Sequence, residues 1–244
     1  MRLLDGLLDL IYPPRCALCG MFYDGEEEAS GAVLCTGCRG EFPEIGSPLC
    51  PVCGRPFVSE SGEDHWCEAC MRKPPAYDAL GAPFLFDGLI MDAIHRFKYG
   101  RRPHLGRSLG PLLADFAAKC TENLDGLLVF PVPLHPRRLR ERGFNQSLIL
   151  ARHVVARLGG KLDFMNLRRI RYTLPQTGLG RDDRKKNVRR AFGLTDPAAL
   201  KNGNALLIDD VATTGNTLNE CAGVLKRAGC ESVTCLVLAR AARR

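Results

Sequence analysis

The chain has 244 residues, of which 45% are hydrophobic, and a formal net charge of +7 at pH 7. This length allows one domain of ordinary size and a second, smaller one. No stretch reaches the ~20 apolar residues of a membrane span, so we expect none. Residues 1–12 carry Asp5 and Asp9 within an apolar pattern, which fits a short amphipathic helix better than a secretion signal and favours a cytoplasmic location.

Cysteine pairs follow this helix. Eight of the twelve cysteines form four C-x-x-C pairs, with fifteen residues between the first two pairs and thirteen between the last two. This spacing predicts two consecutive zinc ribbons, each with four thiolates around one tetrahedral ion. The expected ligands are Cys16, Cys19, Cys35 and Cys38 for the first zinc ion and Cys50, Cys53, Cys67 and Cys70 for the second. The alternative is a cross-braced arrangement, which joins the first pair to the third.

Other uses of paired cysteines fit this segment less well. Disulfides require an oxidising compartment, and redox C-x-x-C motifs occur singly. His65 could replace a ligand beside Cys67, but a solvated loop histidine is the simpler interpretation. A segment so poor in periodic apolar residues lacks a core, and structural zinc, worth roughly 10–16 kcal/mol per site, would supply the missing stability. The remaining cysteines, which lie in apolar patterns and are expected in the core, are Cys120, Cys221, Cys230 and Cys235.

The charge changes sign near residue 75. Residues 1–75 contain 6 basic and 12 acidic side chains, a net charge of −6, whereas residues 76–244 contain 28 and 15, a net charge of +13. We therefore expect two domains, a helix with a double zinc ribbon in residues 1–75 and a basic domain in residues 76–244. The basic domain would face an anionic partner, such as pyrophosphate or nucleic acid.

Apolar runs and helical periodicity alternate through the basic domain. Strands are expected at residues 81–86, 127–132, 205–211 and 233–239, and helices at residues 89–98, 105–121, 145–158 and 216–229. One of these helices continues despite Pro111. The alternation predicts an α/β fold with a parallel sheet and flanking helices, preceded by the small zinc-ribbon domain.

A basic loop, PVPLHPRRLRERGFNQS, follows the second strand at residues 131–147. Three prolines are expected to hold it extended, and four arginines charge it. Such a loop can wrap a pyrophosphate with guanidinium groups, although an exposed basic turn would have the same composition.

Residues 172–192 form a second long, polar and non-periodic segment. Its profile is typical of a mobile lid over an active site, and equally of a disordered linker. Its basic residues add to the anion-binding surface expected of the domain.

The most informative stretch is ALLIDDVATTGNT, residues 205–217. A buried strand leads into Asp209 and Asp210, and a turn rich in small and hydroxyl residues leads into a helix. Ligands of parallel α/β sheets bind at this edge, and a helix N-terminus receives phosphate. The pattern predicts a site for a phosphorylated sugar, in which the carboxylates accept hydrogen bonds from two vicinal hydroxyls of the sugar. A Walker A loop and a dinucleotide-binding G-x-G-x-x-G are absent here, and an ordinary capped helix is the remaining alternative.

The thirteen residues 205–217 resemble the signature of type I phosphoribosyltransferases, which bind phosphoribosyl pyrophosphate (PRPP). The basic loop at 131–147, the IHRFKYG segment at 94–100 and the cysteine-rich leader extend the likeness to the ComF family (ComFC- and GntX-like) over nearly the whole chain. This resemblance implies that PRPP, carrying Mg²⁺ on its own oxygens, binds to the residues of the signature. These are Asp209, Asp210, Ala212, Thr213, Thr214, Gly215, Asn216 and Thr217.

If PRPP is the donor, negative charge develops on the departing pyrophosphate, and Arg137, Arg138 and Arg142 are the candidates for stabilising it. The resemblance also places Gln176, Arg184 and Asn187 in the flexible loop. For some family members it implies a role in the uptake of single-stranded DNA during natural transformation, with a DNA-import helicase as a further candidate partner.

Two hypotheses follow from these patterns. In the first, the chain is an enzyme that transfers a phosphoribosyl group from PRPP to an acceptor that the sequence does not identify. In the second, it is a PRPP-binding or single-strand-binding module of a DNA import apparatus with no chemistry of its own. Sequence-neutral strand binding combines basic grooves with stacking aromatic rings, and the basic segments contain few aromatic residues.

Overall fold

The computed structural model describes residues 13, 15–22, 32–58, 62–120, 125–172, 190–200 and 203–242. The helix predicted at residues 1–12 lies outside these residues, as do Gln176, Arg184 and Asn187 of the expected flexible loop. Within the described part, no helix combines the length and the apolar character needed to cross a membrane.

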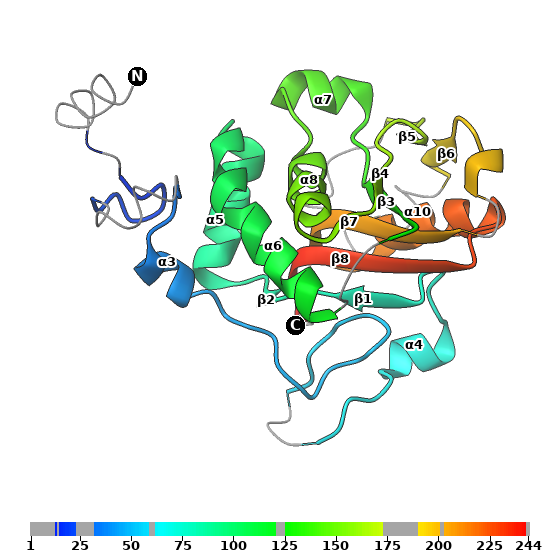
Figure 1. Cartoon of the computed structure of the whole chain (residues 1–244). Coiled ribbons are helices and arrows are strands. Elements are labelled where there is room, and N and C mark those ends of the chain that lie inside the picture. Colours follow the sequence, from blue (N-terminus) through cyan, green and yellow to red (C-terminus); the bar gives the residue numbers. More distant parts are fainter. Residues whose placement is uncertain are drawn as a thin grey trace.

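The centre of the molecule is a six-stranded sheet with the order β1-β8-β7-β3-β4, in which β2 also pairs with β8 (Figure 1). Every pairing in this sheet is parallel. Its strands are β1 (Ala79–Gly81), β2 (Phe84–Leu85), β3 (Leu127–Pro131), β4 (Lys161–Leu162), β7 (Asn204–Ala212) and β8 (Ser232–Arg240). A separate antiparallel pair consists of β5 (Leu167–Arg169) and β6 (Phe192–Leu194).

Helices cover both faces of the sheet. The zinc-ribbon part contributes the short helices α3 (Thr36–Gly40) and α4 (Glu68–Arg72). The α/β part contains α5 (Gly88–Tyr99), η1 (Pro103–Leu105), α6 (Gly106–Cys120), α7 (Pro136–Arg142), α8 (Gln146–Leu158), η2 (Ala198–Leu200) and α10 (Asn216–Arg227). In Figure 1, α5, α6 and α8 lie together on one side of the sheet.

Strand β7 is apolar on both sides because it lies between two hydrophobic clusters. Ala205 and Leu207 belong to a cluster with α10, whereas Leu206 and Ile208 belong to a cluster with α5, α6 and α8. The cysteines divide in the same way. Those at positions 50, 53, 67 and 70 join the α10 cluster, and Cys16 and Cys38 join the other. Each cysteine group therefore packs on a different face of the sheet.

The predicted fold class, a parallel α/β sheet with flanking helices preceded by zinc ribbons, is confirmed. One predicted strand is wrong in detail, since residues 81–86 contain the end of β1 and all of β2. Strands β1 and β2 pair with β8 in the same register, with Gly81 opposite Leu236 and Phe84 opposite Ala239. Pro83 lies between them, and its missing N–H interrupts the ladder.

The basic loop is not extended throughout, as its prolines had suggested, because Pro136–Arg142 forms helix α7. Pro136 occupies the first helical position, where its missing N–H costs nothing and its fixed φ favours a helix. His135 Nδ1 accepts the Arg137 N–H at 3.3 Å, and Gly143 ends the helix with a φ of +84°. The arginines are thus carried on a helix above the sheet edge.

Candidate functional site

The two adjacent carboxylates lie near the carboxyl end of β7, which continues to Ala212. Asp209 is 8% exposed and Asp210 is 2% exposed. Two neighbouring buried acids need partners, because burial disfavours their charged forms. They have them: Ser147 Oγ donates to Asp209 Oδ1 at 2.8 Å, and Lys98 Nζ lies 2.9 Å from Asp210 Oδ2.

The pKa values of Asp209 and Lys98 are both shifted by burial and by the charges around them. Burial, followed by the neighbouring charge of Asp210, raises the pKa of Asp209 to about 7, against the opposing effects of Lys98 and Ser147. Burial alone would lower the pKa of Lys98, but the two carboxylates outweigh it and raise that pKa. The carboxylate oxygens of the pair thus have three donors, which are the Lys98 ammonium, the Ser147 hydroxyl and the backbone N–H of Asp210. Ligand hydroxyl groups are donors of the same kind.

The 212–217 loop connects β7 to α10. Gly215 adopts a φ of +77° at the N-cap of α10, a conformation that a side chain would strain, and Thr214 Oγ1 accepts the Asn216 N–H at 3.4 Å. The loop and the start of α10 surround a hollow of ≈ 30 Å³ that reaches back to Asp209. The amino end of a 12-residue helix presents N–H groups and a positive dipole end, which favour a phosphate.

A larger cavity of ≈ 180 Å³, the central cavity, opens above the carboxylates. Its polar lining includes Asp209, Asp210, Lys98, Arg138, Arg142, Gln146, Arg169 and Thr217. The structure thus brings two of the three candidate catalytic arginines to the acid pair. Arg137 does not line this cavity, because its Nε donates to Glu141 Oε1 at 3.1 Å and its guanidinium lies over the Tyr172 ring at 4.8 Å.

Sequence reasoning had not assigned roles to Lys98, Ser147 and Arg169. Lys98 comes from the IHRFKYG segment on α5, and Ser147 from the end of the basic loop, so both stood in stretches already noted for their resemblance. Only the fold places them beside β7. Arg169 lies on β5 in the basic cluster of residues 168–171, a pattern that predicts an anion-binding surface but not a place in this cavity.

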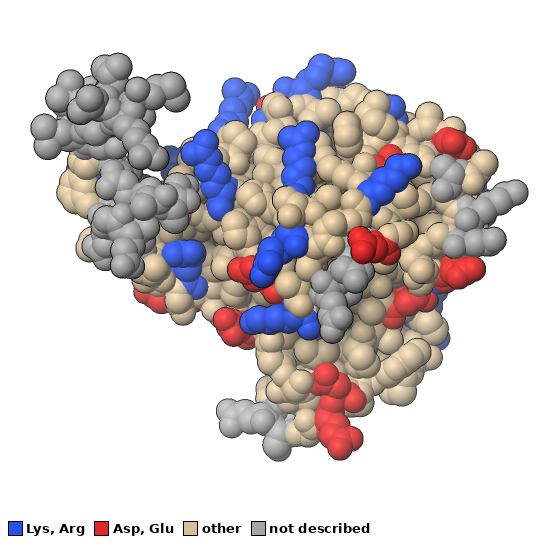
Figure 2. Space-filling model, viewed as in Figure 1, with Lys and Arg blue, Asp and Glu red and all other residues tan. Residues whose placement is uncertain are grey.

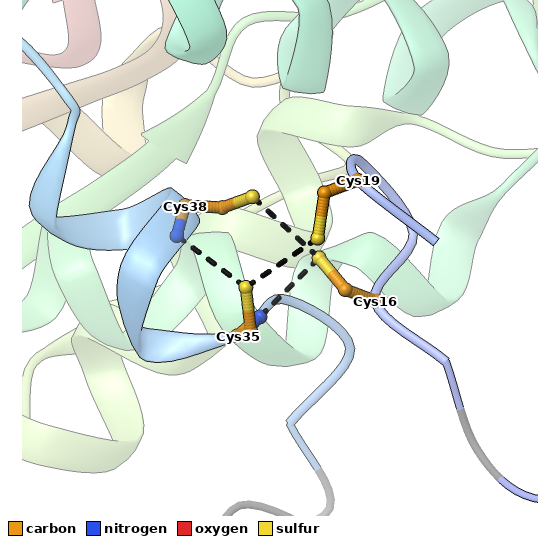
Figure 3. A group of neighbouring side chains, drawn as sticks. All are labelled: Cys16, Cys19, Cys35 and Cys38. Carbon is orange, nitrogen blue, oxygen red and sulfur yellow. Dashed lines mark hydrogen bonds between the residues drawn. The ribbon is translucent and has the colours of Figure 1, made fainter. Parts of the chain in front are cut away.

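The eight paired cysteines form two groups of four, and the sulfur atoms within each group lie within 4.8 Å of one another. The groups are sequential, so the cross-braced alternative is wrong. In the first group, shown in Figure 3, the C-x-x-C turns of two chain segments point their sulfur atoms toward one point. We call residues 16–38 the first ribbon and residues 50–70 the second ribbon.

Both groups fit a tetrahedral zinc ion. Sulfur atoms bound to zinc at ~2.3 Å lie about 3.8 Å apart in a tetrahedron. Cys16 and Cys38 are 3.8 Å apart, Cys19 and Cys35 are 3.8 Å apart, and Cys53 and Cys67 are 3.7 Å apart. All twelve cysteines are free of disulfides.

Backbone N–H groups support the thiolates. The Leu18 and Cys35 N–H groups both donate to Cys16 Sγ at 3.4 Å, and the Cys67 N–H donates to Cys50 Sγ at the same distance. His65 is not a member of either group; its ring stacks on Phe57 with centroids 4.0 Å apart. The simpler interpretation of His65 therefore holds, and each ion would have four sulfur ligands.

Two family models match separate stretches of the chain. Residues 7–71 match a double zinc ribbon domain, and residues 145–244 match a phosphoribosyl transferase domain. Among solved structures, a hypoxanthine phosphoribosyltransferase from Staphylococcus aureus aligns over 55% of this chain and 64% of its own, with 15% identity. The TM-score of this alignment is 0.37.

Relatives match across both parts. The chain is 33% identical over 219 residues to competence protein F of Haemophilus influenzae, an alignment that covers 85% of this chain and 90% of the relative. It is 32% identical over 195 residues to the DNA utilization protein YhgH of Salmonella typhimurium, covering 79% and 84%. Competence protein ComFC of Streptococcus pneumoniae is 27% identical over 242 residues, covering 93% and 100%.

Proposed function

We propose that this chain, which belongs to the ComF family of competence and DNA-utilization proteins, binds PRPP at the carboxyl edge of its sheet and serves the handling of imported DNA. The main support for this proposal is that three different structural features lie next to one another. A buried acid pair, the 212–217 loop and two arginines of the basic loop surround two hollows that share Asp209, Val211 and Thr217 in their linings. These parts match a ribose, its 5-phosphate and a pyrophosphate respectively.

The ribose half of the proposal rests on hydrogen-bond exchange. Ribose hydroxyls would donate hydrogen bonds to the carboxylates of Asp209 and Asp210. They would replace or share the bonds that Ser147 and Lys98 now donate. The 5-phosphate would accept N–H groups of the 212–217 loop. Both interactions use groups that are already in place, so little reorganisation is needed on binding.

The pyrophosphate half rests on Arg138 and Arg142. Breaking the bond at the anomeric carbon of PRPP moves negative charge onto the departing pyrophosphate, and guanidinium groups aimed at it would stabilise that charge. Arg142 is held by Gln146, whose Oε1 accepts from Nη1 at 2.6 Å. Mg²⁺ prefers phosphate and water oxygens with few carboxylates, so it would arrive mainly on the oxygens of PRPP.

Calorimetric titration with PRPP and Mg²⁺ tests binding. Arg138→Met should weaken the affinity for PRPP by about 1.5–3 kcal/mol, the value of a hydrogen bond to a charged group, whereas Arg137→Met, its neighbour outside the central cavity, should weaken it less. Equal losses of PRPP affinity in the two variants would show that the pyrophosphate does not bind to Arg138. Release of pyrophosphate in a screen of acceptors separates an enzyme from a binding module.

A second candidate function, the binding of single-stranded DNA, is favoured by the charge distribution. Residues 76–244 carry a net charge of +13, and Arg96, Arg101, Arg102, Arg137 and Arg140 are all exposed. Figure 2 shows basic side chains spread from the top to the middle of this face, with acidic ones between them, along the right side and at the lower end. Binding would be mainly electrostatic and therefore strongly dependent on salt.

Replacing Arg101, Arg102 and Arg140 by Gln tests this second candidate. If each contacts one phosphate, the slope of log affinity against log salt should fall by about 2, since each contact with a single strand contributes ~0.7. PRPP affinity serves as the folding control. An unchanged slope would place the DNA surface elsewhere.

A further inference from the structure

Arg240, the last residue of β8, connects two parts of the molecule that are far apart in sequence. It is 1% exposed. Its Nε donates to the carbonyl oxygen of Cys53 at 2.9 Å, and its Nη1 donates to the carbonyl oxygens of Ala212, at 2.7 Å, and Thr213. One guanidinium therefore joins the backbone of a zinc-ligand residue of the second ribbon to the start of the 212–217 loop.

We propose that Arg240 is a positioning residue through which the second zinc ribbon sets the conformation of the 212–217 loop. The inference rests on the proposed function, in which that loop binds the 5-phosphate of PRPP. In a trans peptide the C=O and the following N–H point in opposite directions. Fixing the carbonyl groups of Ala212 and Thr213 on Arg240 therefore turns the N–H groups of Thr213 and Thr214 away from it, as donors for a ligand.

The second ribbon is seated closely enough to transmit a change. Gly54, which follows Cys53, has a φ of +61°, and a Cβ at this position would lie 2.4 Å from the Leu80 carbonyl oxygen of β1. The Gly54 N–H donates to the Cys50 carbonyl at 2.8 Å, which closes the turn that carries both cysteines. Loss of the metal would free this turn and with it the carbonyl that Arg240 uses.

A second contact runs in parallel. The segment after the second ribbon meets α10, where the Ala76 N–H donates to Asn219 Oδ1 at 2.8 Å. The Tyr77 hydroxyl lies 3.0 Å from the position that a Cβ on Gly215 would take. A cavity of ≈ 450 Å³ lies beside these contacts, with Arg55 and Lys73 from the ribbon side and Asn216 from the loop side.

Charge favours the same arrangement. The recorded hydrogen bonds of Arg240 go to carbonyl oxygens, which are dipoles and not anions. A buried guanidinium needs compensating negative charge. Four thiolates around Zn²⁺ carry a net charge of −2, and Cys53 is one of them. Metal binding and the burial of Arg240 thus support each other.

Arg240→Met and Arg96→Met form a matched pair of tests. Arg96 on α5 donates to the carbonyl oxygens of Ala17 and Leu18, so it holds the first ribbon as Arg240 holds the second. Arg240→Met should speed amide hydrogen exchange at Thr213 and Thr214 and weaken ribose 5-phosphate binding, each by about tenfold or more, the loss expected for a charged hydrogen bond. Arg96→Met should change neither. Equal behaviour of the two variants overturns the inference.

Zinc binding by the unaltered protein gives a test that needs no variant. By linkage, ribose 5-phosphate should raise the affinity of one zinc site, measured by equilibrium competition with a chelator, and leave the affinity of the other site unchanged. A higher affinity at both sites or at neither contradicts a link confined to the second ribbon. If neither ribose 5-phosphate nor PRPP binds, the proposed function fails, and the exchange rates in Arg240→Met, or in Arg240→Lys if the first variant does not fold, still decide the role of Arg240.

Discussion

The two zinc ribbons have the same ligand pattern but different surroundings. In the first ribbon Cys19 is exposed, and the ribbon rests on helices: Ser108 Oγ of α6 accepts the N–H groups of Val33 and Leu34 at 2.8 and 3.2 Å. In the second ribbon all four cysteines are buried, in one hydrophobic cluster with β7, β8 and α10. The first ribbon therefore packs two of its four ligands, Cys16 and Cys38, into the cluster around α5, α6 and α8, whereas the second packs all four into the cluster around α10.

The second ribbon is joined directly to a loop of the proposed PRPP site, whereas the first ribbon contacts α5 outside that site. Arg96 ties the first ribbon to α5, and the same helix carries Lys98 to the acid pair. Arg240 ties the second ribbon to the 212–217 loop. Two similar metal modules therefore have different consequences for the site, and variants on the two sides should separate them.

The largest effect is expected from loss of the second zinc ion. Cys70→Ser should lower the zinc content from two ions to one and the free energy of unfolding by more than about 4 kcal/mol, because the metal centre is part of the core. Cys19→Ser should lose as much zinc with a smaller loss of stability, because Cys19 is exposed. Metal analysis and thermal unfolding measure both. Equal losses of stability would contradict the distinction between the ribbons.

The next effect concerns the acid pair on the side of the first ribbon. Asp210→Asn should cost about 3 kcal/mol of stability, because it leaves Lys98, whose side chain is 17% exposed, without its ion-pair partner. The double variant Lys98→Met/Asp210→Asn should recover most of that loss. Denaturant unfolding measures the difference, and no recovery would mean that the Lys98 charge is balanced by another group.

This pair also shows where sequence reasoning reached its limit. Asp209 and Asp210 were identifiable because the strand, the acids and the turn are contiguous in the chain. Lys98 comes from a helix more than a hundred residues earlier, and its role depends on the parallel packing that brings α5 to β7. A residue whose partner is so distant leaves no periodic signal.

A third effect should appear as a pH dependence at Asp209. Its folded pKa of about 7 lies above the ordinary carboxyl value, because burial and the charge of Asp210 favour the protonated form. The stabilising contribution of this proton is therefore complete below about pH 4 and is lost as the pH rises through about 7. Unfolding of the unaltered protein and of Asp209→Asn should show the unaltered protein losing stability relative to the variant over this range. Parallel curves would contradict it.

The smallest effect is expected from Arg96→Met, which removes exposed hydrogen bonds to the first ribbon. The free energy of unfolding should fall by less than about 1 kcal/mol. The first zinc ion should be released to a chelator faster, and the second at its former rate. Faster release of both ions would indicate that the ribbons act as one unit.

The sequence alone determined the parts that are local. Cysteine spacing indicated the two metal centres, and the residues from Ala205 to Thr217 indicated the strand, the acids and the turn into α10, because each is a contiguous pattern. Tertiary structure alone decided that the cysteine groups are sequential, that Arg138 and not Arg137 lines the central cavity, and that Lys98 meets Asp210. These three features depend on distances between segments that are far apart in the chain. The packing of the sheet against its helices determines those distances, and no local sequence pattern predicts them.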